Sequence, residues 1–179
     1  MDRDQGPRSS CPLYNIDSAA MWQGTGVQAA EMAEEGPTVW MGDFNAWTGE
    51  LLESEGAEPR AADVYFAPAP RASRKRTANE YGRQLVAALG GANMRILNGR
   101  SWDGEVPAAE WTRRHPSGNS HTVIDYVAVS ESLSAQKFDA GVVQDVLQSD
   151  HRPVGVELDG VPVTEGPVGR SIKTKHQVR

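Results

Sequence analysis

Two polar side chains, Asp43 and Asn45, directly follow a short apolar run that ends in a glycine, in the sequence TVWMGDFN (38–45). Such a run followed by a turn signal predicts a buried strand. If the strand geometry continues through Phe44, Asp43 and Asn45 point to one side while Phe44 points into the core. A carboxylate and an amide directed together from a strand end can hold a water molecule and a phosphate oxygen. The alternative is a simple turn, because Asp and Asn are common turn residues.

A second carboxylate, Asp125, lies inside the apolar and β-branched run Thr122–Ser130, and Asp150 and His151 follow at the start of a later strand. Burying an unpaired carboxylate is costly, so Asp125 needs a partner, for which a histidine cation or a metal ion is suitable. An Asp that orients a His builds a general base, and the carboxylate of Asp150 can bind a hard cation through oxygen. The ordinary alternatives are a backbone hydrogen bond for Asp125, a turn at Asp150 and a surface position for His151.

The one concentrated basic run is RASRKR (71–76), which carries Arg71, Arg74, Lys75 and Arg76. The formal net charge of the chain is −6, and its sequence pI is near 5.2. This balance gives no general attraction to nucleic acid, so any contact with a phosphate backbone must be local. The run is therefore either a local nucleic-acid contact or a solvated surface loop.

The elements that must position these residues follow from apolar periodicity and turn signals. One helix is predicted from Asp17 or Ser18 to about Glu35, and a second, capped by Asn79, from Glu80 to about Leu89. Strands are predicted at 38–42, 95–98, 111–112, 122–130, 142–146 and 154–158, and the segment 46–70 is predicted to be a loop. A helix that leads directly into a buried strand indicates α/β layers, with 122–130 as a central strand.

Length and composition indicate one domain of 179 residues, or at most two small ones. The single cysteine, Cys11, excludes an internal disulfide and a cysteine-based zinc cluster, and it favours a reducing compartment. No apolar run is long enough to span a membrane, and the N-terminus lacks the apolar core of a secretory signal. Residues 1–12 are predicted to be disordered, 13–160 to form the domain, and 161–179 to be a disordered tail or linker.

Five segments of the chain carry a resemblance to a known family: Gly42–Ala46, Asn79–Gly82, Arg95–Arg100, Thr122–Val127 and Ser149–Val154. In this order, they resemble motifs of the endonuclease/exonuclease/phosphatase superfamily of metal-dependent phosphodiesterases, which includes apurinic endonucleases and DNase I-like enzymes. Within it, the chain looks most like the endonuclease domain of non-LTR retrotransposon polyproteins. The Gly-Asp-x-Asn motif alone is a weak signal, whereas the ordered combination of GDFN, IDYV and SDH is specific for the superfamily. A threonine starts the fourth segment where the family usually has serine, which keeps the hydroxyl.

The resemblance implies an α/β fold of the DNase I-like two-sheet sandwich type and a Mg²⁺- or Mn²⁺-dependent endonuclease that cleaves DNA. By resemblance, His151 is the general base or a phosphate-binding imidazolium, and Asp125 pairs with it and fixes its tautomer. Asp150 is then a metal ligand, Asp43 positions the attacking water, and Asn45 binds the scissile phosphate. These roles suit phosphodiester hydrolysis, which needs an activated water and a cation near the phosphate. A retrotransposon origin implies work inside the cell, in the nucleus.

The chain departs from the family in its N-terminal region. Family members supply a metal-binding Glu, an Asn, and a Tyr or His from a first half, whereas residues 1–42 alone precede Asp43 here. The sequence therefore resembles the C-terminal part of the domain, with the N-terminal half missing. Weak Mg²⁺ binding is expected, because Mg²⁺ keeps its waters unless several oxygens converge, and so is an exposed apolar face. The missing half or a reverse transcriptase domain is then an expected partner besides DNA.

Two other functions stay open on sequence grounds. The first is a phosphoesterase that acts on RNA, a phosphoinositide or another small phosphate ester, because superfamily membership does not fix the substrate. The second is a non-catalytic fragment or pseudoenzyme, which the absence of the N-terminal Glu favours. A Ser/His/Asp hydrolase is disfavoured, because the sequence contains no GxSxG motif.

Overall fold

The computed structural model describes residues 18–53, 71–103, 105, 107–108, 110–115, 117–118, 120–134, 136–143 and 149–160. The described helices are α1 (Ser18–Glu35), α2 (Glu80–Gly91) and α3 (Glu131–Ser134). The described strands are β1 (Val39–Asp43), β2 (Met94–Ile96), β3 (Arg113–Arg114), β4 (His121–Thr122), β5 (Asp125–Ser130), β6 (Phe138–Val142) and β7 (Val154–Leu158). Both tails predicted to be disordered, 1–12 and 161–179, lie outside the described residues, as does segment 54–70.

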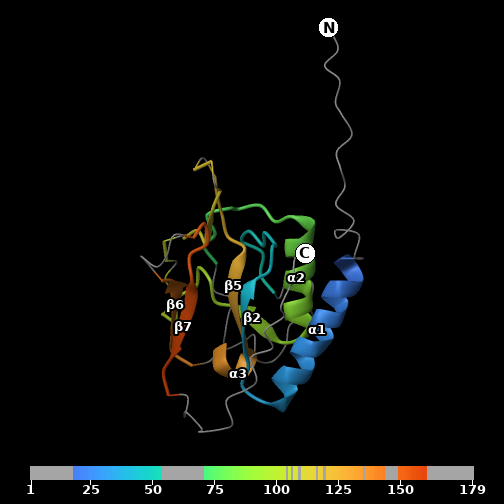
Figure 1. Cartoon of the computed structure of the whole chain (residues 1–179). Coiled ribbons are helices and arrows are strands. Elements are labelled where there is room, and N and C mark those ends of the chain that lie inside the picture. Colours follow the sequence, from blue (N-terminus) through green and yellow to red (C-terminus); the bar gives the residue numbers. More distant parts are fainter. Residues whose placement is uncertain are drawn as a thin grey trace.

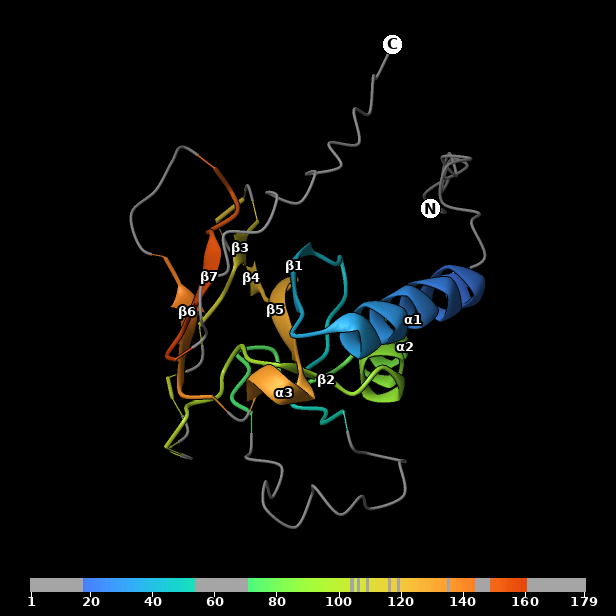
Figure 2. The same cartoon turned by 90° about the horizontal axis from the view of Figure 1, so that it is seen from below.

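The fold is mixed α/β with antiparallel sheets. The central sheet has the strand order β1-β5-β2, and β5 pairs antiparallel with both neighbours. Helices α1 and α2 lie together on one face of this sheet, and the β6–β7 pair lies on the other (Figure 1). Seen from below, β1 and β5 lie between the helices and the β6–β7 pair (Figure 2). The short β3–β4 pair leads into β5 at the end of the sheet where β1 finishes.

Strand β5 is buried along its whole length, because both of its faces are covered. Tyr126 and Ala128 belong to the core cluster that includes α1 and α2, whereas Val127 and Val129 belong to the cluster with β6 and β7. Alternate residues of a strand face opposite sides, so a strand covered on both sides requires a continuous apolar run. The predicted central strand is confirmed, except that the chain breaks at 123–124 into β4 and β5.

Both long helices occupy their predicted places, and α2 begins at its predicted cap. The side-chain oxygen of Asn79 accepts hydrogen bonds from the backbone N–H groups of Gly82 and Trp47, at 2.8 and 3.0 Å. The cap therefore joins the segment after β1 to the start of α2. A Cβ at Gly82 would lie 1.8 Å from the carbonyl oxygen of Trp47, so only glycine permits this approach. None of the described helices is long and apolar enough to cross a membrane.

Strand β1 corrects the prediction of a buried strand. It lies at the edge of the central sheet, and its residues are exposed except for the half-buried Trp40. Trp40 and Phe44 pack on the helix-side cluster. Val39 and Met41 alternate with Trp40 and so face the other side, where they are 38% and 49% exposed. An apolar run indicates burial only where neighbouring elements cover both faces, and here one face of the edge is open.

Two of the short strands are displaced from their predicted places. Strand β3 begins at Arg113, two residues after the predicted start, and β6 ends where a strand at 142–146 was expected to begin. Residues 144–146 lie outside the described part of the chain. Half-buried and exposed residues alternate along β6, so the pattern of a half-buried strand is present at 138–142 and was not recognised there. Strand β7 lies where predicted, and β2 overlaps its prediction.

Candidate functional site

The Asp125–His151 pair is the centre of the candidate site. Nδ1 of His151 lies 3.1 Å from each carboxylate oxygen of Asp125. The Asp125 side chain is 12% exposed and that of His151 is 30% exposed. An ionised carboxylate only accepts hydrogen bonds, so Nδ1 carries the proton and Nε2 is the nitrogen left for a substrate or water. The expected contact between Asp125 and His151 is therefore confirmed, whereas the role of His151 as a base stays a prediction.

Asp43 lies directly opposite Asp125 in the antiparallel pairing of β1 with β5. Residues directly opposite in such a pair share one face of the sheet, and two like charges there repel each other. One ligand atom from each of Asp43, Asp125 and His151 lies within 4.8 Å of the other two. We refer to these three residues as the Asp–Asp–His cluster. A cation beside the cluster would relieve the repulsion between its carboxylates.

The donor set of the Asp–Asp–His cluster suits a hard divalent cation in part. Mg²⁺ and Mn²⁺ prefer carboxylate oxygens, and Asp43 and Asp125 supply two carboxylates on one face. Mg²⁺ requires octahedral coordination, so two carboxylates leave the remaining positions to water. Two carboxylates alone favour weak binding, and these residues differ from Asp150, the metal ligand implied by the resemblance. Binding of a cation here stays a prediction.

The backbone N–H and carbonyl groups of Asp125 are both hydrogen-bonded to side chains. Its N–H and that of Ile124 donate to Oγ1 of Thr112, each at 3.1 Å. Its carbonyl oxygen accepts from Nδ2 of Asn98 at 3.0 Å, and Oδ1 of Asn98 accepts from the N–H of Val127 at 2.8 Å. Buried backbone groups need such partners where sheet pairing stops. The sequence indicated neither function, because Asn98 was placed at the end of a predicted strand and a single threonine carries no signal.

Asn45 adopts a different conformation from the one that strand geometry predicts. Its φ is +49°, and its N–H donates to Oδ1 of Asp43 at 2.8 Å. A residue in the left-handed region ends the extended chain, and the contact to Asp43 is a side-chain-supported turn. The expected shared direction through Phe44 is therefore wrong, and the turn interpretation is right for the backbone. Phe44 packs on the core as expected. The phosphate-binding role of Asn45 stays a prediction.

Asp150 lies beside the Asp–Asp–His cluster in sequence but not within it. Its Oδ2 accepts from Nε of Arg113 at 3.2 Å, and its backbone carbonyl accepts from the N–H of Arg114 at 2.7 Å. The hydrogen bond from Arg113 lowers the pKa of the Asp150 carboxyl below its ordinary value. The carboxylate thus holds β3 against the segment of His151. Metal binding by Asp150 stays a prediction, and its observed partner is a cation of the protein itself.

Arg71 corrects the predicted nucleic-acid interface. Only 4% of this residue is exposed. Its Nη2 donates to Oγ1 of Thr48 and to the backbone carbonyls of Gly49 and Leu51, at 2.8 to 3.0 Å. Burial lowers the pKa of the Arg71 guanidinium, and the three oxygens compensate the buried cation. Arg71 therefore fixes the segment after β1, and it has no exposed surface to offer a phosphate backbone.

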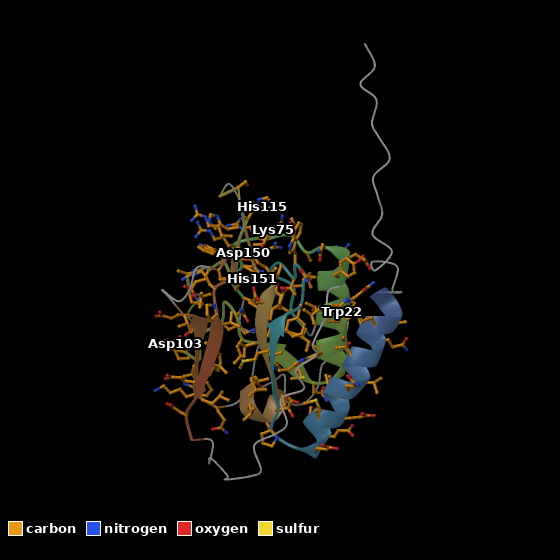
Figure 3. The ribbon with its side chains drawn as sticks, in the orientation of Figure 1. Trp22, Lys75, Asp103, His115, Asp150 and His151 are labelled. Atoms are coloured by element: carbon orange, nitrogen blue, oxygen red, sulfur yellow. The ribbon has the colours of Figure 1, made fainter. Side chains whose placement is uncertain are left out.

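The other three basic residues of the run reach the surface. Arg74 and Arg76 are exposed, and Nζ of Lys75 lies 3.6 Å from the ring centroid of Trp47. Nε of Arg76 lies 3.8 Å from the Glu50 carboxylate, an exposed pair of little energetic weight. Figure 3 shows Lys75 at the same end of the molecule as His151. Binding of nucleic acid by Arg74, Lys75 and Arg76 stays a prediction.

The chain matches no family model and no curated protein. Function is therefore inferred from the Asp–Asp–His cluster, its supporting hydrogen bonds and the sequence motifs that contain it.

Proposed function

We propose that this chain carries the reaction centre of a metal-dependent phosphodiester hydrolase that acts on DNA. The observation that carries the proposal is the Asp–Asp–His cluster, in which His151 Nδ1 contacts both oxygens of Asp125 and Asp43 lies on the same face. The ordered GDFN, IDYV and SDH motifs support an origin among endonuclease/exonuclease/phosphatase proteins of the non-LTR retrotransposon type. A two-sheet DNase I-like sandwich belongs to the same proposal.

The residues divide the work of hydrolysis among them. Asp125 holds the Nδ1 proton of His151, so Nε2 is the atom that exchanges a proton with the reacting groups. Asp43 orients the attacking water. Asn45, whose backbone N–H donates to Asp43, contacts the phosphate. A divalent cation, when bound, neutralises charge that develops on the phosphate oxygens. Asp125 also stabilises the imidazolium that forms when His151 takes a proton.

DNA is the proposed substrate because positive charge is concentrated locally in a chain of net charge −6. Arg74 and Arg76 are exposed, and Lys75 lies at the end of the molecule that carries His151 (Figure 3). Cationic side chains that track a phosphate backbone supply affinity without sequence recognition. Binding is therefore expected to weaken steeply with salt.

The test is nicking of supercoiled plasmid by the purified chain with Mg²⁺ or Mn²⁺. We expect nicking that disappears in EDTA and in His151→Ala. Asp139→Asn is the matched control, because Asp139 is an exposed carboxylate on β6 outside the cluster. The control should nick at the wild-type rate. Nicking that is indifferent to EDTA and to His151→Ala would reject the proposal.

The substrate class is tested separately with RNA and with an inositol phosphate under the same conditions. Preference for plasmid over both supports the DNA assignment. Cleavage of RNA or of the inositol phosphate alone would keep the hydrolase and overturn the DNA substrate.

A second candidate function is a non-catalytic piece that docks on another polypeptide. The observation that favours it is β1, which pairs with only one strand among the described residues and exposes Val39 and Met41. Exposed edge strands with apolar side chains are surfaces for strand addition. A chain that is folded by circular dichroism and nicks no substrate with either cation would favour this function over the hydrolase.

A further inference from the structure

Thr112 lies between the two segments that carry Asp125 and His151, and it forms hydrogen bonds with both segments. It is buried, and its Oγ1 accepts from two consecutive amides, those of Ile124 and Asp125. Its carbonyl oxygen accepts from the N–H of Arg152, the residue after His151, at 2.7 Å. A single residue thus ties the start of β5 to the segment that leads into β7.

The two amides that meet Oγ1 lie where the chain passes from the β3–β4 pair to the central sheet. Strand β4 ends at Thr122 and β5 begins at Asp125, so Ile124 lies outside both strands. The N–H of Thr112 donates to the carbonyl of Thr122 at 2.9 Å, which places Thr112 beside this transition. Because the hydroxyl substitutes for a missing strand partner, it fixes where the Cα–Cβ bond of Asp125 points.

The bond to Arg152 has a corresponding effect on His151. It is flanked by the bond from the N–H of Arg114 to the carbonyl of Asp150 and by an isolated bridge between Arg113 and His151. These contacts set residues 112–114 in register with residues 150–152. A shift of Thr112 would therefore move both partners of the Asp125–His151 contact.

We propose that Thr112 is a positioning residue, whose hydroxyl holds Asp125 so that both of its oxygens face Nδ1 of His151. The inference rests on the proposed function for its kinetic consequence. Its structural consequence, the hydrogen bond between Asp125 and His151, is measurable in the absence of any reaction. Thr112 touches none of the reacting atoms in this role and acts through Asp125.

The test compares three variants of the full chain that keep, weaken or remove the hydrogen-bond acceptor of the Thr112 side chain. Thr112→Ser keeps the oxygen acceptor, Thr112→Cys replaces it with a weak sulfur acceptor, and Thr112→Val removes it while keeping the shape. Thr38→Val is the matched control, because Thr38 is a buried threonine whose hydroxyl bonds only to the carbonyls of Met32 and Gly36 among the described residues.

Two quantities are measured on each protein. The first is the downfield proton resonance of His151 Nδ1, assigned by its loss in His151→Ala, which reports the charge-assisted bond to Asp125 without DNA or metal. The second is plasmid nicking, separated into kcat and KM. We expect the resonance and kcat to be retained in Thr112→Ser and Thr38→Val and reduced in Thr112→Cys. In Thr112→Val, kcat should fall about 10- to 100-fold with little change in KM, because misplacement of a catalytic group affects the reaction step.

The variants separate the possible outcomes. A resonance that is unchanged in Thr112→Cys and in folded Thr112→Val, or damage by Thr112→Ser equal to that by Thr112→Cys, would overturn the positioning role. If Thr112→Val does not fold, the difference between Ser and Cys decides. Failure of the wild-type chain to nick DNA would reject the proposed function alone, since the imidazole resonance still tests the inference.

Discussion

Two acid–base pairs in this molecule differ in what surrounds them. Glu53 and Arg100 form an ion pair at 2.7 Å in which each side chain is 6% exposed. The other oxygen of Glu53 accepts from the N–H of Ile96 at 2.7 Å, and Nε of Arg100 donates to the carbonyl of Ile96 at 2.8 Å. The Asp125–His151 pair is more exposed, and a second carboxylate, that of Asp43, lies across from it.

This difference is the basis for assigning the first pair a structural role and proposing a reactive role for the second. The charges of Glu53 and Arg100 balance, and both side chains are engaged with each other and with the backbone of β2. The Asp–Asp–His cluster instead combines two carboxylates with one imidazole, and in the proposed function it binds a cation and keeps Nε2 for a substrate. Complete pairing stabilises a fold, whereas incomplete pairing at a partly exposed edge is what a reaction requires.

The largest effect on stability is expected at the buried pair. Arg100→Met removes the cation that pairs with the buried Glu53 carboxylate, which lowers the free energy of unfolding by about 3–5 kcal/mol. Arg83→Met is the control, because Arg83 pairs with Glu80 on the exposed face of α2 and contributes less than about 1 kcal/mol. Urea unfolding measures both variants. Equal losses in the two would contradict the structural role of the buried pair.

The largest effect on activity is expected at the reactive pair. Asp125→Asn removes the charge that stabilises the His151 imidazolium, so plasmid nicking should fall about 10²- to 10⁴-fold while the fold is retained. Arg100→Met, assayed at a temperature where it is still folded, should nick at the wild-type rate per folded molecule. A loss of nicking that follows the folded fraction in both variants would remove the distinction between the pairs.

A smaller effect is expected from the repulsion between opposed carboxylates. Asp43→Asn keeps the Oδ1 acceptor for the N–H of Asn45 and removes one of the two like charges. Without metal, this variant should be more stable than the wild type by about 0.2–1 kcal/mol. Adding Mn²⁺ should stabilise the wild type and not the variant, because a ligand stabilises only the state that binds it. Thermal unfolding with and without Mn²⁺ measures this; a destabilised metal-free variant would argue against repulsion.

The smallest effect is expected at Asp150, the exposed carboxylate bonded to Arg113. Its pKa is lowered from 3.8 chiefly by the hydrogen bond from Arg113. A lowered pKa in the folded state means that the contribution to stability is present above the unfolded pKa and is lost as the pH falls through the folded value. The carboxyl carbon of Asp150, followed by NMR, should titrate below 3.8 in the wild type and closer to it in Arg113→Gln. Identical titration in both proteins would refute the contact.

The sequence predicted the positions of helices and strands better than it predicted which of them are buried. The cap at Asn79 and the apolar run within 122–130 predicted α2 and β5, because a cap is a local feature and a strand covered on both faces requires a continuous apolar run. The same type of run failed at β1, because its exposure depends on which strands flank it in space. The prediction that Arg71 lies at the surface was wrong for the same reason, because the oxygen atoms that accept its hydrogen bonds lie about twenty residues earlier in the chain.

The sequence predicted the residues of the candidate site better than the hydrogen bonds that hold them in place. The cost of burying Asp125 predicted a partner, and His151 is that partner. The opposition of Asp43 to Asp125 comes from strand register, which the motifs do not encode. Thr112 and Asn98 act through backbone groups of Asp125, so their residue types alone gave no indication of that function.

The most direct test of the central claim is an NMR titration of the full chain with Mn²⁺, which broadens nearby resonances. The Asp–Asp–His cluster predicts that signals of Asp43, Asp125 and His151 broaden first, at low Mn²⁺, and recover in EDTA. Signals of the buried Glu53 should not change at that concentration. Broadening centred on Asp150 with the cluster unaffected, or no local broadening at all, would contradict a cation-binding site at these three residues.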